Sequence, residues 1–262
     1  MSGPRPALRA FVLDGEDAAA ALDWLHVHAD LDGVLEGDDG SVTVWLQGGL
    51  PELPFAALAV RELPIAPADW TITGLEHDAA IRVADDLLVR PPWVARPAGF
   101  VGVELVVPRG AAFGSGEHAS TQAALRLLHR TWREPASLAD VGTGSGILAL
   151  YAAVRGCRRI AACDIDAPSV AAARELLPDA AIHVGGAEAL PPCDCVVANM
   201  TASELHASLD AILAAWTGRG VLLLGGLRAG EVAGLAARLP TPPFDRETVG
   251  EFTALAWSGS GR

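Results

Sequence analysis

The chain contains no lysine, because all 19 of its basic residues are arginine, and these face 32 Asp and Glu residues. The net charge is −13, and the longest basic run is Arg158-Arg159. Such a chain is poorly suited to gripping a phosphate backbone, so we expect no direct nucleic-acid binding. A cationic substrate suits the charge better, but the same acid excess is equally typical of a solvated surface.

Long apolar runs are missing too. No stretch of about 18 apolar residues occurs, and the N-terminus lacks a charged-then-apolar signal pattern, so we expect a cytoplasmic protein without membrane contact. Cysteine is scarce, without C-x-x-C pairs or histidines at metal spacing. We therefore expect no bound metal and four buried, reduced thiols, at Cys157, Cys163, Cys193 and Cys195.

The most informative stretch is Asp140-Val-Gly-Thr-Gly-Ser-Gly146. It joins a predicted strand, Ser137 to Val141, to a predicted helix, Ile147 to Val154. The next strand, Arg159 to Cys163, places Asp164 at its carboxyl end. A carboxylate at that point can accept both ribose hydroxyls of a nucleoside, so we predict an adenosine cofactor.

The spacing of the glycines indicates which adenosine cofactor binds. Dinucleotide sites use G-x-G-x-x-G, whereas Gly142, Gly144 and Gly146 alternate here, and no G-x-x-x-x-G-K-[ST] motif for a triphosphate is present. S-adenosylmethionine fits better, because glycine permits close approach of its amino-acid end and its cationic sulfonium tolerates Asp140 nearby. The glycines alone could form an ordinary turn of an α/β protein, but Asp164 at this distance argues against that.

The chain changes character near residue 66, and we divide it there. Residues 1–66 hold 11 acidic residues and 3 arginines, a charge of −8. Their predicted order is β-α-β-β-α-β, which indicates a small ferredoxin-like domain. The expected elements are a strand at Leu8 to Leu13, a helix at Asp17 to His28, a hairpin of Gly33 to Glu36 with Val42 to Leu46, a weak helix near Phe55 and a strand at Val60 to Leu63.

Residues 67–100 are expected to be a linker with a short helix and a connecting segment, and residues 101–262 a second domain. Leu87 to Trp93 and Val101 to Val107 are expected to be strands that lead into this domain. Strands and helices alternate through that domain, which indicates a doubly wound, mostly parallel sheet. Its last two strands, Glu247 to Val249 and Phe252 to Trp257, are separated only by Gly250-Glu251. This spacing predicts a hairpin and therefore an antiparallel edge.

Two further segments carry chemistry. Asn199 ends a predicted strand immediately before a capping box, Thr201-x-x-Glu204, which places its amide at the carboxyl edge of the sheet, where ligands bind. A turn residue that bonds local backbone is the alternative for Asn199.

The polar loop Ala112 to Thr121 contains a single aromatic residue, Phe113, and suits a ligand lid. His118, taken alone, is more typical of a surface or packing position than of a catalytic base.

Together these segments resemble the PrmA family, the bacterial lysine methyltransferases that modify ribosomal protein L11. The resemblance spans nearly the whole chain, and its most specific parts are Ala112 to Thr121, Asp140 to Ala149, Asp164-Ile-Asp166, Val197 to Asn199 with Glu204-Leu-His206, and Gly250 to Ala256. Ser120 departs from the family, which usually has a second Thr there, and the N-terminal domain matches in pattern only.

The resemblance implies a class I S-adenosylmethionine-dependent methyltransferase fold with a Rossmann-like sheet. It places cofactor contacts at Thr121, Gly142, Asp164 and Asn199, beside the rest of the glycine loop. It also implies that the N-terminal domain docks a basic ribosomal protein. We expect a monomer that methylates lysine or α-amino nitrogens.

In the expected reaction, Asn199 orients the attacking amine through its side-chain oxygen and Phe113 helps to exclude water. The sequence offers no strong candidate for a general base. Many methyltransferases of nucleobases continue such an asparagine with Pro-Pro and an aromatic residue, whereas Met200-Thr201 follow here. Three alternatives remain: a methyltransferase of another protein or a small molecule, a nicotinamide-dependent dehydrogenase, and a binding protein without activity.

Overall fold

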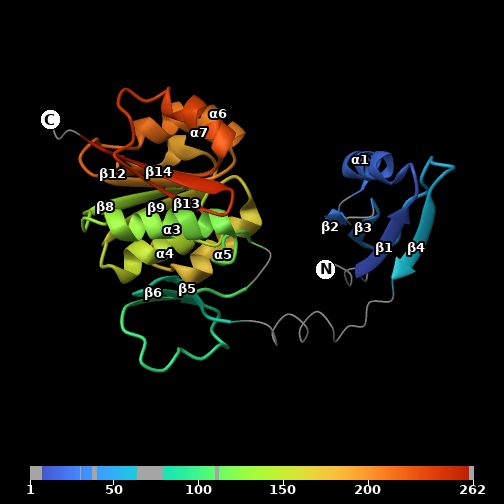
Figure 1. Cartoon of the computed structure of the whole chain (residues 1–262), viewed down its shortest axis with the longest axis horizontal. Coiled ribbons are helices and arrows are strands. Elements are labelled where there is room, and N and C mark those ends of the chain that lie inside the picture. The colour runs from blue at the N-terminus through green and yellow to red at the C-terminus, as the bar shows by residue number, and fades with distance from the viewer. Residues whose placement is uncertain (1–7, 30, 37–39, 64–78, 110–111, 260–262) are drawn as a thin grey trace, which may run out of the picture. The chain divides into compact units, whose positions relative to one another are not determined.

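The computed structural model describes residues 8–29, 31–36, 40–63, 79–109 and 112–259, and the chain divides into units 1–77 and 78–262 (Figure 1). The boundary expected at residue 66 and the short helix expected in the linker fall outside the described residues. One part of the expected linker is wrong. Strands β5 (Ile81–Ala84) and β6 (Leu87–Arg90) belong to the second unit, because β6 pairs with β5 and with β7 (Val103–Val106).

The first unit is an antiparallel sheet covered on one face by α1 (Ala18–His28). The strand order is β2-β3-β1-β4, with β1 and β3 in the centre, which is the ferredoxin-like arrangement that the sequence predicted. Its strands are β1 (Leu8–Asp14), β2 (Leu31–Glu36), β3 (Val42–Gln47) and β4 (Ala59–Leu63).

The helix expected near Phe55 is not formed, and that prediction was wrong. Residues 48–58 are bends, turns and irregular backbone. Pro51 and Pro54 explain this, because each lacks a backbone N–H and clashes with a preceding helical turn. Leu53 and Phe55 nevertheless pack against the core of the first unit. The loop therefore supplies the apolar contact that the missing helix would have made.

The second unit is built on a sheet with the order β10-β9-β8-β11-β12-β14-β13. The strands from β10 to β12 are parallel, and β14 runs antiparallel to both of its neighbours. This confirms the class I fold, with the reversed strand second from the edge. The strands are β8 (Ser137–Val141), β9 (Arg159–Asp164), β10 (Ala181–Val184), β11 (Cys195–Asn199), β12 (Val221–Arg228), β13 (Asp245–Val249) and β14 (Phe252–Ser258).

Helices cover both faces of this sheet, as parallel crossovers require (Figure 1). Side chains that alternate along each strand enter opposite cores, so Leu138 packs on one side and Ala139 on the other. One face holds α3 (Ala119–Thr131), α4 (Ile147–Val154) and α5 (Ala167–Leu176), and the other holds α6 (Ala202–Ala214) and α7 (Ala229–Ala236).

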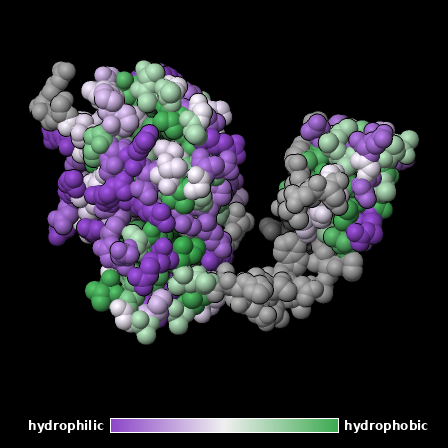
Figure 2. Space-filling model, in the orientation of Figure 1, coloured by the Kyte–Doolittle hydropathy of each residue, from purple (hydrophilic) through white to green (hydrophobic). Residues whose placement is uncertain are grey.

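The face of the second unit shown in Figure 2 is largely hydrophilic, as expected of a surface in contact with water. All four cysteines are buried and free, as expected. Burial raises the pKa of the Cys163 thiol to about 11, so it stays protonated at neutral pH. None of the described helices is long and apolar enough to cross a membrane.

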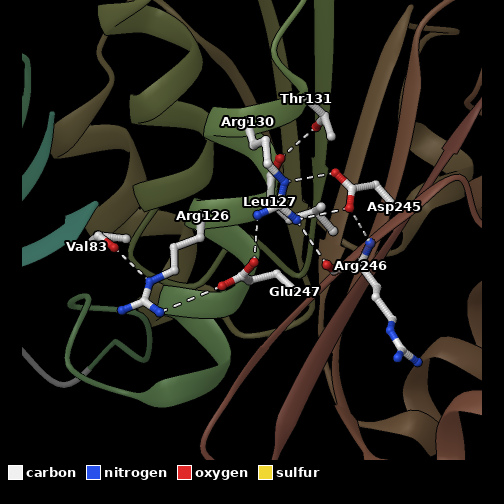
Figure 3. A network of polar contacts seen from close by, with 8 residues as sticks. All are labelled: Val83, Arg126, Leu127, Arg130, Thr131, Asp245, Arg246 and Glu247. Carbon is white, nitrogen blue, oxygen red and sulfur yellow. Dashed lines mark hydrogen bonds and ion pairs between the residues drawn. The ribbon is translucent and has the colours of Figure 1, made fainter. Parts of the chain in front are cut away.

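A network of arginines fixes α3 to the far edge of the sheet (Figure 3). Arg130 donates to Asp245 over 2.9 Å and to Glu247 over 2.6 Å, both on β13. Arg126, one turn earlier, donates to the Val83 carbonyl of β5 over 2.7 Å. This network joins β5, α3 and β13, and so it fixes the helix whose first turn reaches the functional site.

Candidate functional site

A cavity of about 730 Å³ opens at the carboxyl edge of the large sheet. Its volume lies within the usual range of small-molecule sites. The ends of β8, β9, β11 and β12 meet there, together with the loop before α3 and the start of β14. Most of the expected site residues line it, namely Phe113, Thr121, Gly142, Gly144, Asp164 and Asn199.

The glycine turn has no room for side chains. Gly142 and Gly144 have φ values of 66° and 53°, in the left-handed region that favours glycine. A Cβ on Gly142 would overlap the side chain of Met200, and one on Gly144 would lie 2.5 Å from the carbonyl oxygen of Phe113. The turn is therefore packed between two loops and presents only backbone to the cavity.

The loop before α3 is hydrogen-bonded to this turn. The backbone N–H of Ser145 donates to the Phe113 carbonyl over 2.8 Å, and its hydroxyl donates to the Gly114 carbonyl, also over 2.8 Å. The side chain of Phe113 remains 58% exposed although it lines the cavity. An exposed aromatic ring on a loop that is fixed at its backbone suits the lid role predicted from the sequence.

Asp164 lies at the end of β9, as predicted. One carboxylate oxygen accepts the N–H of Gly144 over 2.9 Å, and the other accepts the N–H of Asp166 over 2.9 Å. Each oxygen keeps a lone pair for a further donor, so the carboxylate can still receive ribose hydroxyls. Ile165 follows it, 79% exposed and lining the same cavity, where it offers an apolar surface for a purine.

Asp140 and Gly146 do not line the cavity, although we expected both at the cofactor. Asp140 is fully buried and accepts hydrogen bonds from the Thr143 hydroxyl over 2.7 Å and the Ala149 N–H over 3.2 Å. Burial raises the pKa of this carboxyl to about 6. Gly146 lies against Ala173 of α5. Both residues thus support the turn and the start of α4 from the side that faces away from the cavity.

Two buried polar atoms at the cavity have no hydrogen-bond partner among the described residues. They are the hydroxyl oxygen of Thr121 and the side-chain oxygen of Asn199. The side chain of Asn199 has room in this position because residue 225 is glycine. A Cβ on Gly225 would lie 2.8 Å from the side-chain oxygen of Asn199. Burying unpaired polar groups is costly. These atoms therefore fit a ligand rich in ammonium, carboxylate and hydroxyl groups, as S-adenosylmethionine is.

Sequence reasoning missed several residues that line the same cavity, namely Ile165, Met200, Arg228 and Phe252. Phe252 stands inside the segment Gly250 to Ala256 that carried the family resemblance, which was the only signal for it. His118 is exposed, as expected of a surface position, and it also lines the cavity. It caps α3 by accepting the N–H of Ser120, and its ring contacts that of Phe252.

Comparison with known proteins identifies the family. A family model for ribosomal protein L11 methyltransferase (PrmA) matches residues 46–253. The chain belongs to this family. S-adenosylmethionine is the methyl donor of PrmA methyltransferases, which confirms the predicted cofactor. The alternative of a nicotinamide-dependent dehydrogenase is therefore wrong.

Individual relatives agree. Ribosomal protein L11 methyltransferases of Dechloromonas aromatica and Pelotomaculum thermopropionicum are 32% and 34% identical to the chain, each over 78% of it. That of Geotalea uraniireducens is 31% identical over 62% of the chain. The matches span 58 to 70% of the length of these curated relatives.

A solved PrmA-family structure shows the same architecture. The crystal structure of ribosomal protein L11 methylase from Lactobacillus delbrueckii subsp. bulgaricus matches with a TM-score of 0.62 and 26% identity. The match covers 70% of this chain and 99% of that one.

Proposed function

We propose that the chain transfers methyl groups from S-adenosylmethionine to amino nitrogens of ribosomal protein L11, lysine side chains among them. One observation carries the proposal. The unpaired side-chain oxygens of Thr121 and Asn199 and the carboxylate of Asp164 line the same cavity. Membership of the PrmA family and the names of the relatives support this choice of substrate.

The cofactor supplies a methyl group that is already activated by its cationic sulfur. Asp164 would accept the ribose hydroxyls, and Ile165 would pack on the purine. The backbone of Gly142 and Gly144 would permit close approach of the amino-acid end, and the Thr121 hydroxyl would pair with its polar groups. The protein's task is then to align donor and acceptor rather than to activate either one.

Asn199 performs the alignment at the acceptor. Its side-chain oxygen is buried at the end of β11 and held by the contact with Gly225, so it can accept an N–H of the incoming amine in one fixed direction. The ammonium of the acceptor loses one proton to water, and the neutral amine then presents its lone pair to the methyl group. Phe113 lies over the turn and keeps water from the reacting atoms.

Charge favours a cationic substrate at this cavity. Its lining contains the acidic residues Asp164, Glu204 and Glu231, and one arginine, Arg228. The carboxylates of Glu204 and Glu231 are held by helix caps, with the Thr201 N–H and the Arg228 N–H as donors. A lysine side chain or a terminal ammonium therefore enters a negative environment.

The first unit is proposed to dock the substrate. The charge of −8 on residues 1–66 suits a basic target, and tethering raises the local concentration of the target at the active site. The alternative function is methylation of another protein or of a small molecule, for which the same cavity would serve.

The test is to incubate the protein with isotopically labelled S-adenosylmethionine and bacterial ribosomes that lack methylation of L11, and to locate the label by mass spectrometry. We expect label on lysine or terminal amino nitrogens of L11, and much less label with Asn199→Ala. Label on another protein or in a small metabolite would replace L11 as the substrate.

A further inference from the structure

Three aromatic side chains form a wall along the cavity, which we call the aromatic wall: Phe113, His118 and Phe252. The ring centres of Phe113 and His118 are 5.1 Å apart at 62°, and those of His118 and Phe252 are 4.7 Å apart at 59°. The wall joins the loop before α3 to the first residue of β14. Phe113 and His118 belong to one loop, and the fold brings the distant residue Phe252 against His118.

The central ring of the wall is positioned by local hydrogen bonds. The Nδ1 atom of His118 accepts the backbone N–H of Ser120 over 3.3 Å and lies 2.8 Å from the Ser120 hydroxyl. His118 therefore adds a positioned aromatic surface to the cavity.

A cation already lies on this wall. The guanidinium carbon of Arg228 is 5.6 Å from the centre of the Phe252 ring, and its Nε donates to Glu251 over 3.0 Å. The side chains of Arg228 and Glu251 are 62% and 63% exposed. Cation–π contacts and ion pairs that are this exposed are weak, so another cation can displace the guanidinium.

We propose that the aromatic wall is a recognition site for an alkylammonium cation, and that Arg228 occupies it in the free protein until the acceptor's ammonium displaces it. The proposal rests on the proposed function, because lysine side chains and amino termini are such cations at neutral pH. The displaced guanidinium keeps Glu251 as its partner. Arg228 thereby sets how strongly the cavity discriminates in favour of charged acceptors.

The experiment uses the full chain without methyl donor and two probes of nearly equal shape. Choline carries a quaternary ammonium, and 3,3-dimethylbutan-1-ol replaces its nitrogen by carbon. Binding is followed by NMR on the ring protons of His118 and Phe252. We expect choline to shift these signals and to bind at least tenfold more tightly than the neutral alcohol. Equal affinities would overturn the proposal, because size alone would then explain binding.

Variants test the role of the guanidinium. Arg228→Ala should bind choline three to ten times more tightly, with no change for the neutral alcohol. Arg219→Ala is the matched control, because it removes the same charge from the opposite end of β12, roughly 25–30 Å away. If choline bound more tightly by the same factor in both variants, or no more tightly in Arg228→Ala, Arg228 would not be the cation that occupies the aromatic wall in the free protein.

A second pair of variants tests the rings. Phe252→Leu and the exposed Phe113→Leu should each weaken choline binding about fivefold, and Phe252→Leu should remove the gain that Arg228→Ala gives. Phe244→Leu, an exposed ring that does not line the cavity, should change nothing. A folded Phe113→Leu variant with parental choline affinity would contradict the proposal even if Phe252→Leu failed to fold.

These measurements are independent of methyl transfer. If L11 is not methylated while choline behaves as described, the proposed function fails and the cation site stands. If L11 is methylated and both probes bind alike, the cation site alone fails.

Discussion

The backbone N–H of Gly144 donates to the carboxylate of Asp164 over 2.9 Å, so the glycine turn and the acid that follows the next strand are one unit. Asp164→Ala removes this bond together with the proposed ribose contacts. We expect S-adenosylmethionine to bind more weakly by roughly 1.5–3 kcal/mol, the usual scale for hydrogen bonds to a charged acceptor. Isothermal calorimetry measures the loss. Unchanged affinity in a folded variant would remove the ribose role.

Substitutions at Asn199 and Thr121 should affect turnover and cofactor affinity to different degrees. Asn199→Ala is expected to lower kcat more than cofactor affinity, because its buried oxygen is proposed to orient the amine. Thr121→Val should show the opposite bias, because its hydroxyl is proposed to pair with the cofactor. Steady-state kinetics beside direct binding decides this, and equal losses in both quantities for Asn199→Ala would assign that residue to the cofactor.

Asp140 predicts an unusual pH dependence of stability. Burial raises its pKa from 3.8 to about 6, so between these values the folded state binds more protons than the unfolded state. Its contribution is fully present below about pH 4 and is lost as pH rises through 6, which amounts to about 3 kcal/mol. Urea unfolding at several pH values should show the wild type losing this much relative to Asp140→Asn. Parallel curves would contradict the shift, and exposed Asp179→Asn is the control.

Arg130 should matter for stability and little for chemistry. Its side chain is 46% exposed, so Arg130→Ala should cost only about 1 kcal/mol of unfolding free energy despite its bonds to Asp245 and Glu247. The bond to Arg130 lowers the pKa of Asp245, so the loss is present at neutral pH and shrinks as acid protonates that carboxylate. Thermal unfolding measures it. Arg246→Ala is the control, because that side chain points away from the network (Figure 3).

The division of labour between the units can be tested by removing the first one. A chain that begins at Asp78 keeps the second unit and every residue that lines the cavity. It should bind S-adenosylmethionine nearly normally, while methylation of L11 falls by two to four orders of magnitude. Full-length activity should also fall with salt, because screening acts over about 8 Å at physiological ionic strength. L11 methylation at the parental rate would refute docking by the first unit.

The sequence predicted those features that depend on local patterns. Short apolar runs located the strands, and the capping box at Thr201 and Glu204 formed as expected. The glycine turn and Asp164 were found because their spacing follows from a single βαβ unit. Asn199 was placed correctly at the carboxyl edge, because a strand end followed by a helix start leaves few positions for it.

The features that were missed depend on contacts between distant segments. Phe252 reaches the cavity only because β14 returns beside β12 and brings its first residue to His118. Two other errors were local. Asp140 was expected at the cofactor, but its carboxylate accepts the Thr143 hydroxyl and the Ala149 N–H instead. The helix expected near Phe55 is not formed, because Pro51 and Pro54 interrupt that segment.

The conformation of Gly142 has an evolutionary consequence. A Cβ at this position would meet the end of the flexible Met200 side chain, which can move aside, but the residue would still have to keep a φ of 66°, which L side chains rarely adopt. Related chains should therefore vary at position 200 and keep glycine at position 142. The backbone conformation, rather than the volume of the neighbour, preserves this glycine.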